Sequence, residues 1–183
     1  MRKHHPLYFI ALVPPEPLKG KLKLLKKSFG ERFNCKAALK SPPHITLHMP
    51  FRFPEEKEVQ LIEQLQVVSR RDIFTIQLNN FGSFEPRVVY INVDATEQLT
   101  LLFNNVQKTM KRLNVFNADY KNKGFHPHLT IAFRDLKKSI FPIAWDEYQF
   151  KQCSEQFDAD CFVLLKHNGK HWDEYRTISF NNN

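Results

Sequence analysis

Two short stretches of this chain repeat one arrangement of residue types. Both read proline, histidine, aliphatic residue, threonine, aliphatic residue, and they occupy residues 43–47 and 127–131. On an extended strand, residues two apart point to the same face, about 6.6 Å from each other. His44 and Thr46 therefore project together, as do His128 and Thr130, while the aliphatic residues point to the opposite face. Each stretch offers one imidazole and one hydroxyl to a common surface.

Two imidazoles and two hydroxyls suit acid–base chemistry on a phosphate. The imidazole pKa is ordinarily near 6.5, so one ring can be neutral and act as base while the other is protonated and acts as acid. The threonine hydroxyls can donate hydrogen bonds to phosphoryl oxygens that gain charge in the transition state. Opening a 2′,3′-cyclic phosphate uses all four groups. The sequence holds no carboxylate-rich motif for a metal and no serine or cysteine in a nucleophile elbow, so we expect neither metal nor cofactor.

Strands and helices must place these groups. Runs rich in β-branched and aromatic residues predict strands over 7–13, 44–51, 73–81, 88–93, 128–133, 157–166 and 175–180. Apolar residues at helical spacing predict helices between several of them. The first stripe consists of Leu18, Leu22, Leu25 and Phe29. Similar stripes begin at Val59 and Leu99, and a fourth segment, 137–148, is interrupted by Pro142.

The order of these elements is itself repeated. Each histidine motif follows a strand and a helix, and precedes a helical segment and two strands. Phe74 lies 30 residues after His44, and Phe157 lies 29 residues after His128. Because the two halves share little sequence identity, the spacing indicates a structural repeat. We expect one bilobal domain over residues 1–183, with halves of about 1–94 and 95–183 that are free to exchange strands, and with the two motifs facing each other.

The composition is that of a folded protein. Hydrophobic residues make up 42% of the chain, charged residues 25%, and 17 phenylalanines supply core material. No stretch approaches the roughly 20 apolar residues of a membrane helix, so we expect no membrane partner. The cysteines, Cys35, Cys153 and Cys161, are odd in number and have no zinc-site spacing. The sequence therefore favours the reducing cytoplasm, and we take a monomer as the default assembly.

The chain is basic, with a formal net charge of +8 and a sequence pI of about 9.4. Such an excess attracts anionic partners, RNA and nucleotides among them. Part of it is concentrated early in the chain, at Lys19, Lys21, Lys23, Lys26 and Lys27. The alternative interpretation of that cluster is a solvated helix face, and the sequence favours neither over the other.

The paired His-x-Thr-aliphatic motifs resemble those of the 2H phosphoesterase superfamily, in particular its 2′-5′ RNA ligase and cyclic phosphodiesterase branch. The resemblance implies an α+β fold: a bilobal, pseudo-symmetric duplication with two antiparallel sheets facing a central cleft and helices outside. It also implies hydrolysis of 2′,3′-cyclic phosphates to 2′-phosphates and, in some members, reversible 2′-5′ joining of RNA ends. Carried over by position, His44 and His128 are the catalytic pair, and Thr46 and Thr130 bind the phosphate. The family pattern favours His128 as base and His44 as acid, although the near-symmetry leaves either assignment open.

Three further residues are candidates for substrate contacts. Phe125, just before the second motif, could stack on a base. His48 lies four residues after His44, about 13 Å along an ideal strand and on the same face. Arg134 lies six residues after His128 and would share its face if the strand ran that far, within reach of an RNA backbone.

We therefore expect a phosphoesterase that acts on RNA ends or nucleotide cyclic phosphates. Two alternatives remain. One is an RNA- or nucleotide-binding module that keeps the site without turnover. The other is a cyclic phosphodiesterase for a small metabolite, such as a cyclic phosphate of ADP-ribose.

Overall fold

The structure is a computed structural model that describes residues 5–116 and 124–180. Helices separate the strands in the first part of the chain except the third and fourth, and the last three strands follow one another without a helix. Their bounds are β1 (Leu7–Leu12), α1 (Leu18–Phe33), η1 (Ala37–Lys40), β2 (Ile45–Arg52), η2 (Glu55–Lys57), α2 (Glu58–Val68), β3 (Phe74–Phe84), β4 (Val88–Val93), α3 (Glu97–Arg112), β5 (His128–Ala132), α5 (Phe141–Tyr148), β6 (Ser154–Ala159), β7 (Cys161–His167) and β8 (Trp172–Ser179). The two η elements are single 3₁₀ turns.

The strands form one curled antiparallel sheet in the order β6-β3-β4-β5-β2-β1-β7-β8. The predicted α+β class and antiparallel pairing are confirmed. The two sheets expected from the sequence are the two four-stranded halves of this sheet. They join at its centre, where β2 and β5 are linked by a single pair, Ile45 with Leu129. The two motif strands are therefore adjacent in the sheet.

The strand order has an approximate two-fold symmetry about that central pair. Each half contains a motif strand, β2 or β5, beside the strand that precedes it across a helix, β1 or β4. The remaining strands cross over, because β7 and β8 complete the half that contains β2, while β3 and β6 complete the half that contains β5. The halves of the sheet are thus not the halves of the sequence.

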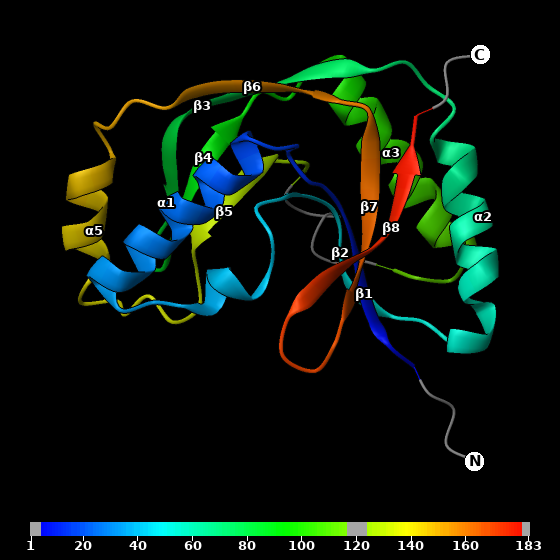
Figure 1. Ribbon diagram of the computed structural model, residues 1–183, viewed down its shortest axis with the longest axis horizontal. Coiled ribbons are helices and arrows are strands. Elements are labelled where there is room, and N and C mark those ends of the chain that lie inside the picture. The colour runs from blue at the N-terminus through cyan, green and yellow to red at the C-terminus, as the bar shows by residue number, and fades with distance from the viewer. Residues whose placement is uncertain (1–4, 117–123, 181–183) are drawn as a thin grey trace.

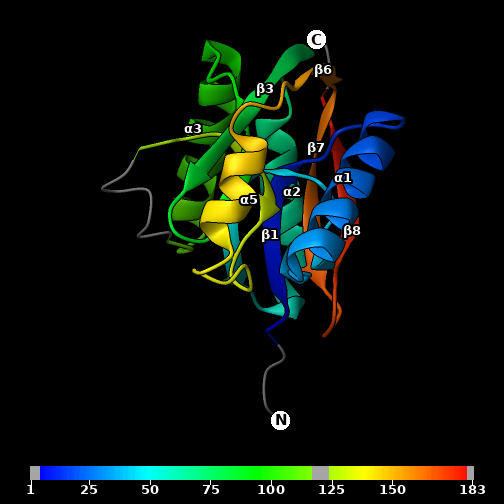
Figure 2. The ribbon, with the colours of Figure 1, turned by 90° about the vertical axis from the view of Figure 1, so that its left-hand side faces the viewer.

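The helices follow the same symmetry. In Figure 1, α1 and α5 lie beside β3, β4 and β5, whereas α2 and α3 lie beside β1, β2, β7 and β8. Figure 2 turns the side with α1 and α5 toward the viewer. The two 16-residue helices, α1 and α3, each contact the motif strand of the other half: α1 contacts β5, and α3 contacts β2. Each motif strand is therefore packed against a helix that precedes the other motif.

Strand β1 is buried on both faces. Tyr8, Ile10 and Leu12 belong to the main hydrophobic core. The alternate side chains face the other side of the sheet, where a smaller cluster consists of Phe9, Ala11, Val163 and Leu165, with Val13 and Trp172 packed against it. Alternation along one strand thus separates the core from a second apolar surface.

Helix α1 is rotated relative to the stripe predicted from the sequence. Its buried residues are Leu18, Leu22, Lys26, Phe29, Gly30 and Phe33, and Leu25 is only half-buried. These positions recur at steps of three and four, the spacing of one helix face. A lysine therefore takes a place in the apolar stripe, which the solvated interpretation of the lysine cluster did not anticipate.

Two other segments differ from their predicted form. The run predicted as one strand over 157–166 is divided between β6 and β7, which separate at Asp160. In the segment 137–148 a helix begins only at Phe141, with Pro142 in its first turn. Proline is accepted there because first-turn amides have no intrahelical acceptor. Within the described ranges, no helix is long and apolar enough to cross a membrane.

Candidate active site

The register of the central strand pair brings the four motif residues together. Ile45 and Leu129 are fully buried, and their pairing is antiparallel. One residue away on either side, His44 lies across from Thr130, and Thr46 lies across from His128. Directly opposed side chains in an antiparallel pair are about 5 Å apart at Cβ. All four point to the face opposite the buried pair, so each histidine is near the threonine of the other motif.

The two histidines make equivalent hydrogen bonds. His44 Nδ1 lies 2.7 Å from the carbonyl oxygen of Pro42, and His128 Nδ1 lies 2.8 Å from that of His126. In both motifs this is the residue two positions earlier. Because a carbonyl oxygen only accepts, Nδ1 carries the hydrogen in each ring. Each Nε2 is then left to take a proton when the ring is neutral or to give one when it is charged.

Aromatic side chains from the neighbouring strands hold both rings in place. Phe9 on β1 packs against His44 with ring centroids 4.8 Å apart. Tyr90 on β4 packs against His128 at 5.0 Å, and Phe84 meets the same ring edge-on at 5.2 Å. β1 and β4 are equivalent strands, so the site repeats not only its hydrogen bonds but also its aromatic support.

The surroundings of both rings favour the neutral imidazole. The pKa of His44 is lowered to about 4, mainly by burial and to a smaller extent by the charges of Lys26 and His128, while the Pro42 hydrogen bond acts in the opposite direction. Burial also lowers the pKa of His128, against the hydrogen bond to the His126 carbonyl and with a weaker lowering by the His126 side chain. Both rings are therefore neutral at neutral pH without substrate. A bound phosphate anion raises the pKa of a nearby imidazole, which would prepare one of them as the acid.

The two threonines are available to a ligand. Thr46 and Thr130 are both half-buried. Within residues 5–116 and 124–180 neither hydroxyl has a hydrogen-bond partner in the protein. The motifs contain no acidic residue that would repel an anion. Two hydroxyls beside two imidazoles therefore suit the oxygens of a phosphate.

His48 does not lie where the sequence predicted it. A β-bulge in β2 changes the alternation, because Ala11 pairs with Thr46 while the preceding Ile10 pairs with His48. Leu47 and His48 are consequently both buried, and His48 is only 2% exposed. Its ring packs edge-on against Phe51 at 5.2 Å. The expectation that His48 shares a face with His44 is wrong for this reason, and a contact between His48 and substrate stays a prediction.

The other two candidate contacts are also placed differently from the expectation. Phe125 stacks on Phe103 of α3 with ring centroids 3.9 Å apart, so one face of its ring is already covered. Its contact with a base stays a prediction. β5 ends at Ala132, and Arg134 adopts a left-handed backbone conformation with its guanidinium over Phe133. The strand does not run as far as Arg134, which removes the reason for placing it on the site's face.

Several neighbours of the histidines could not be found from the motifs. Phe84, which is 41% exposed, contacts both His126 and His128. The Tyr90 hydroxyl lies 3.3 Å from His126 Nε2. These contacts depend on the pairing of β3, β4 and β5, for which the only sequence signal is a strand-like composition. Lys26, whose charge acts on His44, could not be distinguished in the sequence from the exposed lysines near it.

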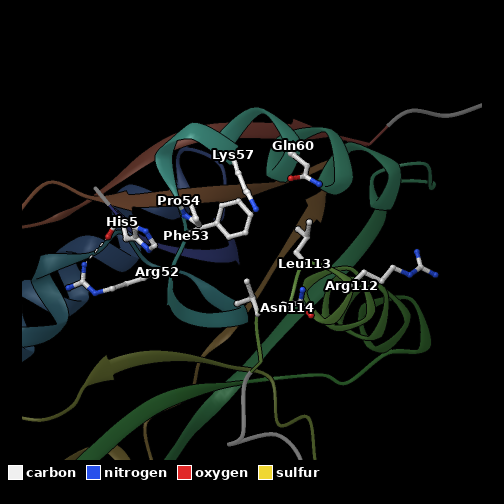
Figure 3. Close-up of a pocket in the computed structure, with 10 residues that line it drawn as sticks. His5, Arg52, Phe53, Pro54, Lys57, Gln60, Arg112, Leu113 and Asn114 are labelled. Atoms are coloured by element: carbon white, nitrogen blue, oxygen red, sulfur yellow. Dashed lines mark hydrogen bonds between the residues drawn. The ribbon is translucent and has the colours of Figure 1, made fainter. Parts of the chain in front are cut away.

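A separate cavity of about 390 Å³ lies at the far end of β2. Figure 3 shows its lining, which includes Arg52, Phe53, Lys57, Leu113 and Asn114. None of the four motif residues lines it. Among the residues that the structure describes, no group of three or more histidine, cysteine, aspartate and glutamate side chains is placed to hold a metal ion.

Solved structures of known proteins share this fold. The protein TT0787 of Thermus thermophilus superposes with a TM-score of 0.71 at 18% identity, covering 96% of this chain and 98% of that one. E. coli LigT complexed with 3′-AMP superposes with a TM-score of 0.69 at 18% identity, covering 98% of this chain and 100% of that one. At this level of identity, the likeness establishes the fold.

Sequence relatives establish the family. A curated Bacillus cytotoxicus protein named "Putative phosphoesterase" is 32% identical over 126 residues, 67% of each chain. A protein of Geobacillus sp. (strain WCH70) with the same description is 27% identical over 176 residues, 93% of this chain and 94% of the relative. The family model described as the 2′-5′ RNA ligase superfamily matches residues 14–171, a range that includes both motifs. This chain belongs to the 2′-5′ RNA ligase superfamily, the 2H phosphoesterase group that its paired motifs resemble.

Proposed function

We propose that this protein is a phosphoesterase that opens 2′,3′-cyclic phosphates to 2′-phosphates by acid–base catalysis with two histidines. One observation carries the proposal: His44 and His128, from opposite halves of the sheet, expose equivalent Nε2 atoms on one face at the central strand pair. A general base and a general acid act together when the reacting atom of the substrate lies between them. The phosphate of a cyclic ester provides that atom.

The reaction needs one proton acceptor and one donor. The neutral imidazole takes a proton from water as the water oxygen bonds to phosphorus. The bond from phosphorus to the ribose 3′ oxygen then breaks, and the protonated imidazole gives its proton to that oxygen. Thr46 and Thr130 donate hydrogen bonds to the two non-bridging oxygens, where negative charge increases. The products are a 2′-phosphate and a free 3′ hydroxyl, and after turnover the histidines have exchanged protonation states.

The same site would also join RNA ends. If a 5′ hydroxyl of a second strand takes the place of water, the same proton transfers form a 2′-5′ linkage. The family's description supports this second use of the site. Microscopic reversibility then allows the enzyme to cleave the linkage that it makes.

RNA ends or nucleotide cyclic phosphates are the substrates we propose. The net charge of +8 favours anionic ligands, and a protein of the same fold is described as a complex with 3′-AMP. The cytoplasm is the location we propose, supported by three cysteines that form no disulfide with one another. We propose a monomer as the working form.

A substrate panel tests the proposal. The protein is incubated, with chelator present, with an RNA ending in 2′,3′-cyclic phosphate, with mononucleotide 2′,3′-cyclic phosphates and with a cyclic phosphate of ADP-ribose. We expect 2′-phosphate products from the first two. A 3′-phosphate product would mean that the 2′ oxygen is the leaving group. Binding without any turnover would favour the alternative of an RNA- or nucleotide-binding module. Preference for the ADP-ribose ester would identify a metabolite enzyme instead.

A further inference from the structure

A lysine is buried behind the first histidine motif. Lys26 lies on α1 and is only 3% exposed, although its neighbours Lys23 and Lys27 on the same helix are exposed. Its Nζ donates a hydrogen bond to the carbonyl oxygen of Ser41 at 2.9 Å and approaches that of Pro42 at 3.5 Å. Both carbonyls belong to the segment that leads directly into His44.

The carbonyl of Pro42 links the lysine to the imidazole. It lies 2.7 Å from His44 Nδ1 and 3.5 Å from Lys26 Nζ. An oxygen held by two donors is fixed in direction, and the imidazole that donates to it is then fixed in its tautomer and orientation. The ammonium group also stands on the Nδ1 side of the ring, opposite the Nε2 that faces the substrate.

No carboxylate neutralises Lys26 within the part of the chain that the structure describes. The charged or titratable groups that act on the His44 ring are Lys26 from α1 and His128 from β5. From β1 the ring meets Phe9, which carries no charge. The positive charge therefore reaches the imidazole without an opposing one.

Among the residues that the structure describes, no lysine is buried behind the other motif. α3 is the symmetry equivalent of α1, and its buried polar residue is Thr109. Together with Lys26, the buried polar and charged residues of the described chain are His48, Ser69 and Thr109. The two halves of the site therefore share their hydrogen bonds and aromatic supports but differ in charge.

We propose that Lys26 is a positioning residue for His44, which fixes the carbonyl that receives the Nδ1 hydrogen and places a positive charge behind the ring, so that the two histidines bind a proton unequally. Its effect on catalysis rests on the proposed function, whereas its effect on the ring does not. Burial also lowers the pKa of Lys26 itself to about 8, so the amine is charged at neutral pH and loses that charge in alkaline solution.

Titration of the imidazoles by NMR tests the effect on the ring. The histidine ring protons are followed from pH 8 downward, as far as each protein stays folded, and the pH at which His44 begins to take up a proton is compared. The proteins are the parent, Lys26→Met, which keeps the length of the side chain but not its charge, and the control Lys23→Met. We expect the pKa of His44 to move upward toward 6.5 in Lys26→Met and to stay unchanged in Lys23→Met. The pKa of His128 should remain that of the parent in both. Unchanged His44 titration in Lys26→Met would overturn the proposal.

The pH dependence of kcat/KM tests the effect on catalysis. We expect Lys26→Met to lose about ten- to a hundredfold at neutral pH, as for other groups that orient an acting side chain from behind. One limb of the profile should move to higher pH: the acidic limb if His44 is the base, the basic limb if it is the acid. A profile with neither limb displaced would contradict the catalytic role.

Thermal unfolding separates this role from a structural one. We expect the melting temperature of Lys26→Met to be no lower than that of the parent, because the variant removes an unpaired charge from the interior. An activity loss accompanied by unfolding at the assay temperature would overturn the positioning role. If the parent has no phosphoesterase activity, the proposed function fails, while the NMR titration still decides whether Lys26 acts on His44.

Discussion

At the scale of single residues, the site depends on which imidazole nitrogen carries the hydrogen. The carbonyl acceptors of Pro42 and His126 settle this in the same way for both motifs. The proline between each carbonyl and its histidine has a fixed φ, which helps to set the turn that brings the two together. The repeated prolines of the motif therefore have a structural reason beside the chemical one.

The threonines should contribute to rate rather than to folding. Replacing Thr46 or Thr130 by valine keeps the shape and removes the hydroxyl. We expect kcat to fall about 10²–10³-fold, by analogy with the loss of one oxyanion donor. The corresponding serine variants keep the hydroxyl and should retain most of the activity. Steady-state kinetics on a mononucleotide cyclic phosphate checks this, and valine variants with parental kcat would remove the threonines from the mechanism.

Acid should destabilise the protein in the range where buried histidines resist protonation. The pKa values of His44, His48 and His128 are all lowered by burial. Below pH 6.5 the unfolded chain binds protons that the folded chain does not. The stability that these neutral histidines contribute is therefore present above pH 6.5 and is lost as the pH falls toward 4. Each histidine contributes a slope of at most about 1.4 kcal/mol per pH unit.

Urea unfolding at pH 7 and pH 5 measures this loss. His48→Leu removes one of the three groups without touching the motif residues, so its stability should depend less steeply on pH than that of the parent. The exposed His171 supplies the control, since His171→Leu should leave the dependence unchanged. Equal pH dependence in His48→Leu and the parent would mean that His48 does not remain neutral in the fold.

The sequence was sufficient to predict the residues of the two motifs but not the residues around them. His44, His128, Thr46 and Thr130 could be named because their spacing alone places them on one strand face. The face of His48 was mispredicted because β2 has a β-bulge at Leu47. The bulge depends on contacts with distant elements, since the Leu47 carbonyl accepts a hydrogen bond from Gln107 of α3. The position of Lys26 on the buried face of α1 was predictable from its helical spacing to Leu22, Phe29 and Phe33. It was overlooked because exposed lysines surround it in the sequence.

At the scale of elements, a side chain from one half supports the other half's motif. Asp135, just beyond β5, accepts hydrogen bonds from the backbone amides of Lys36 and Ala37 at 2.7 and 2.9 Å. These amides open η1, the 3₁₀ turn that leads to the first motif. The carboxylate thus acts as the N-cap of a turn that belongs to a distant part of the sequence.

Removing this cap should loosen the approach to His44. We expect Asp135→Ala to lose about 1 kcal/mol of stability, the ordinary value of an N-cap, and to lower kcat through a less ordered first motif. Asp72, which is exposed and has no such contacts with the residues that the structure describes, gives the control variant Asp72→Ala. Denaturant unfolding and steady-state kinetics measure both effects. Parental stability in Asp135→Ala would show that η1 does not need the carboxylate.

Element boundaries were predictable where they follow local chemistry. β4 has the bounds that composition predicted, and β1, β2 and β5 differ by one or two residues. The run 157–166 was misjudged because Phe157 and Ala159 at the end of β6 come directly before the apolar residues of β7, and the break at Asp160 carries no glycine or proline. In the fourth helical segment, the sequence showed the proline but not that the helix starts beside it.

At the scale of the whole molecule, the repeat explains why one small protein carries the motif twice. Each half of the sequence contributes a motif strand and sends later strands to the other half of the sheet. The repeated offsets indicated the duplication and the meeting of the motifs. They could not show the exchange of strands, because which distant strands pair is decided by packing and not by local spacing.

The symmetry is close in backbone and incomplete in charge. Two matched motifs would give two histidines with the same proton affinity, whereas acid–base catalysis requires that they act differently. A buried cation on one side and none on the other, among the described residues, is one way in which a duplicated fold can become unequal. Small differences of this kind suffice, since one pKa unit corresponds to about 1.4 kcal/mol.

The most direct test of the two-histidine site replaces each ring while the other remains. His44→Gln and His128→Gln are assayed on RNA ending in 2′,3′-cyclic phosphate, with His171→Gln as the matched control and with circular dichroism to verify folding. Because each imidazole transfers a proton in every turnover of the proposed mechanism, we predict that either variant alone loses at least about 10²-fold in kcat, while the control keeps the parental rate. A folded His44→Gln or His128→Gln variant that hydrolyses the substrate at the parental rate would contradict the account.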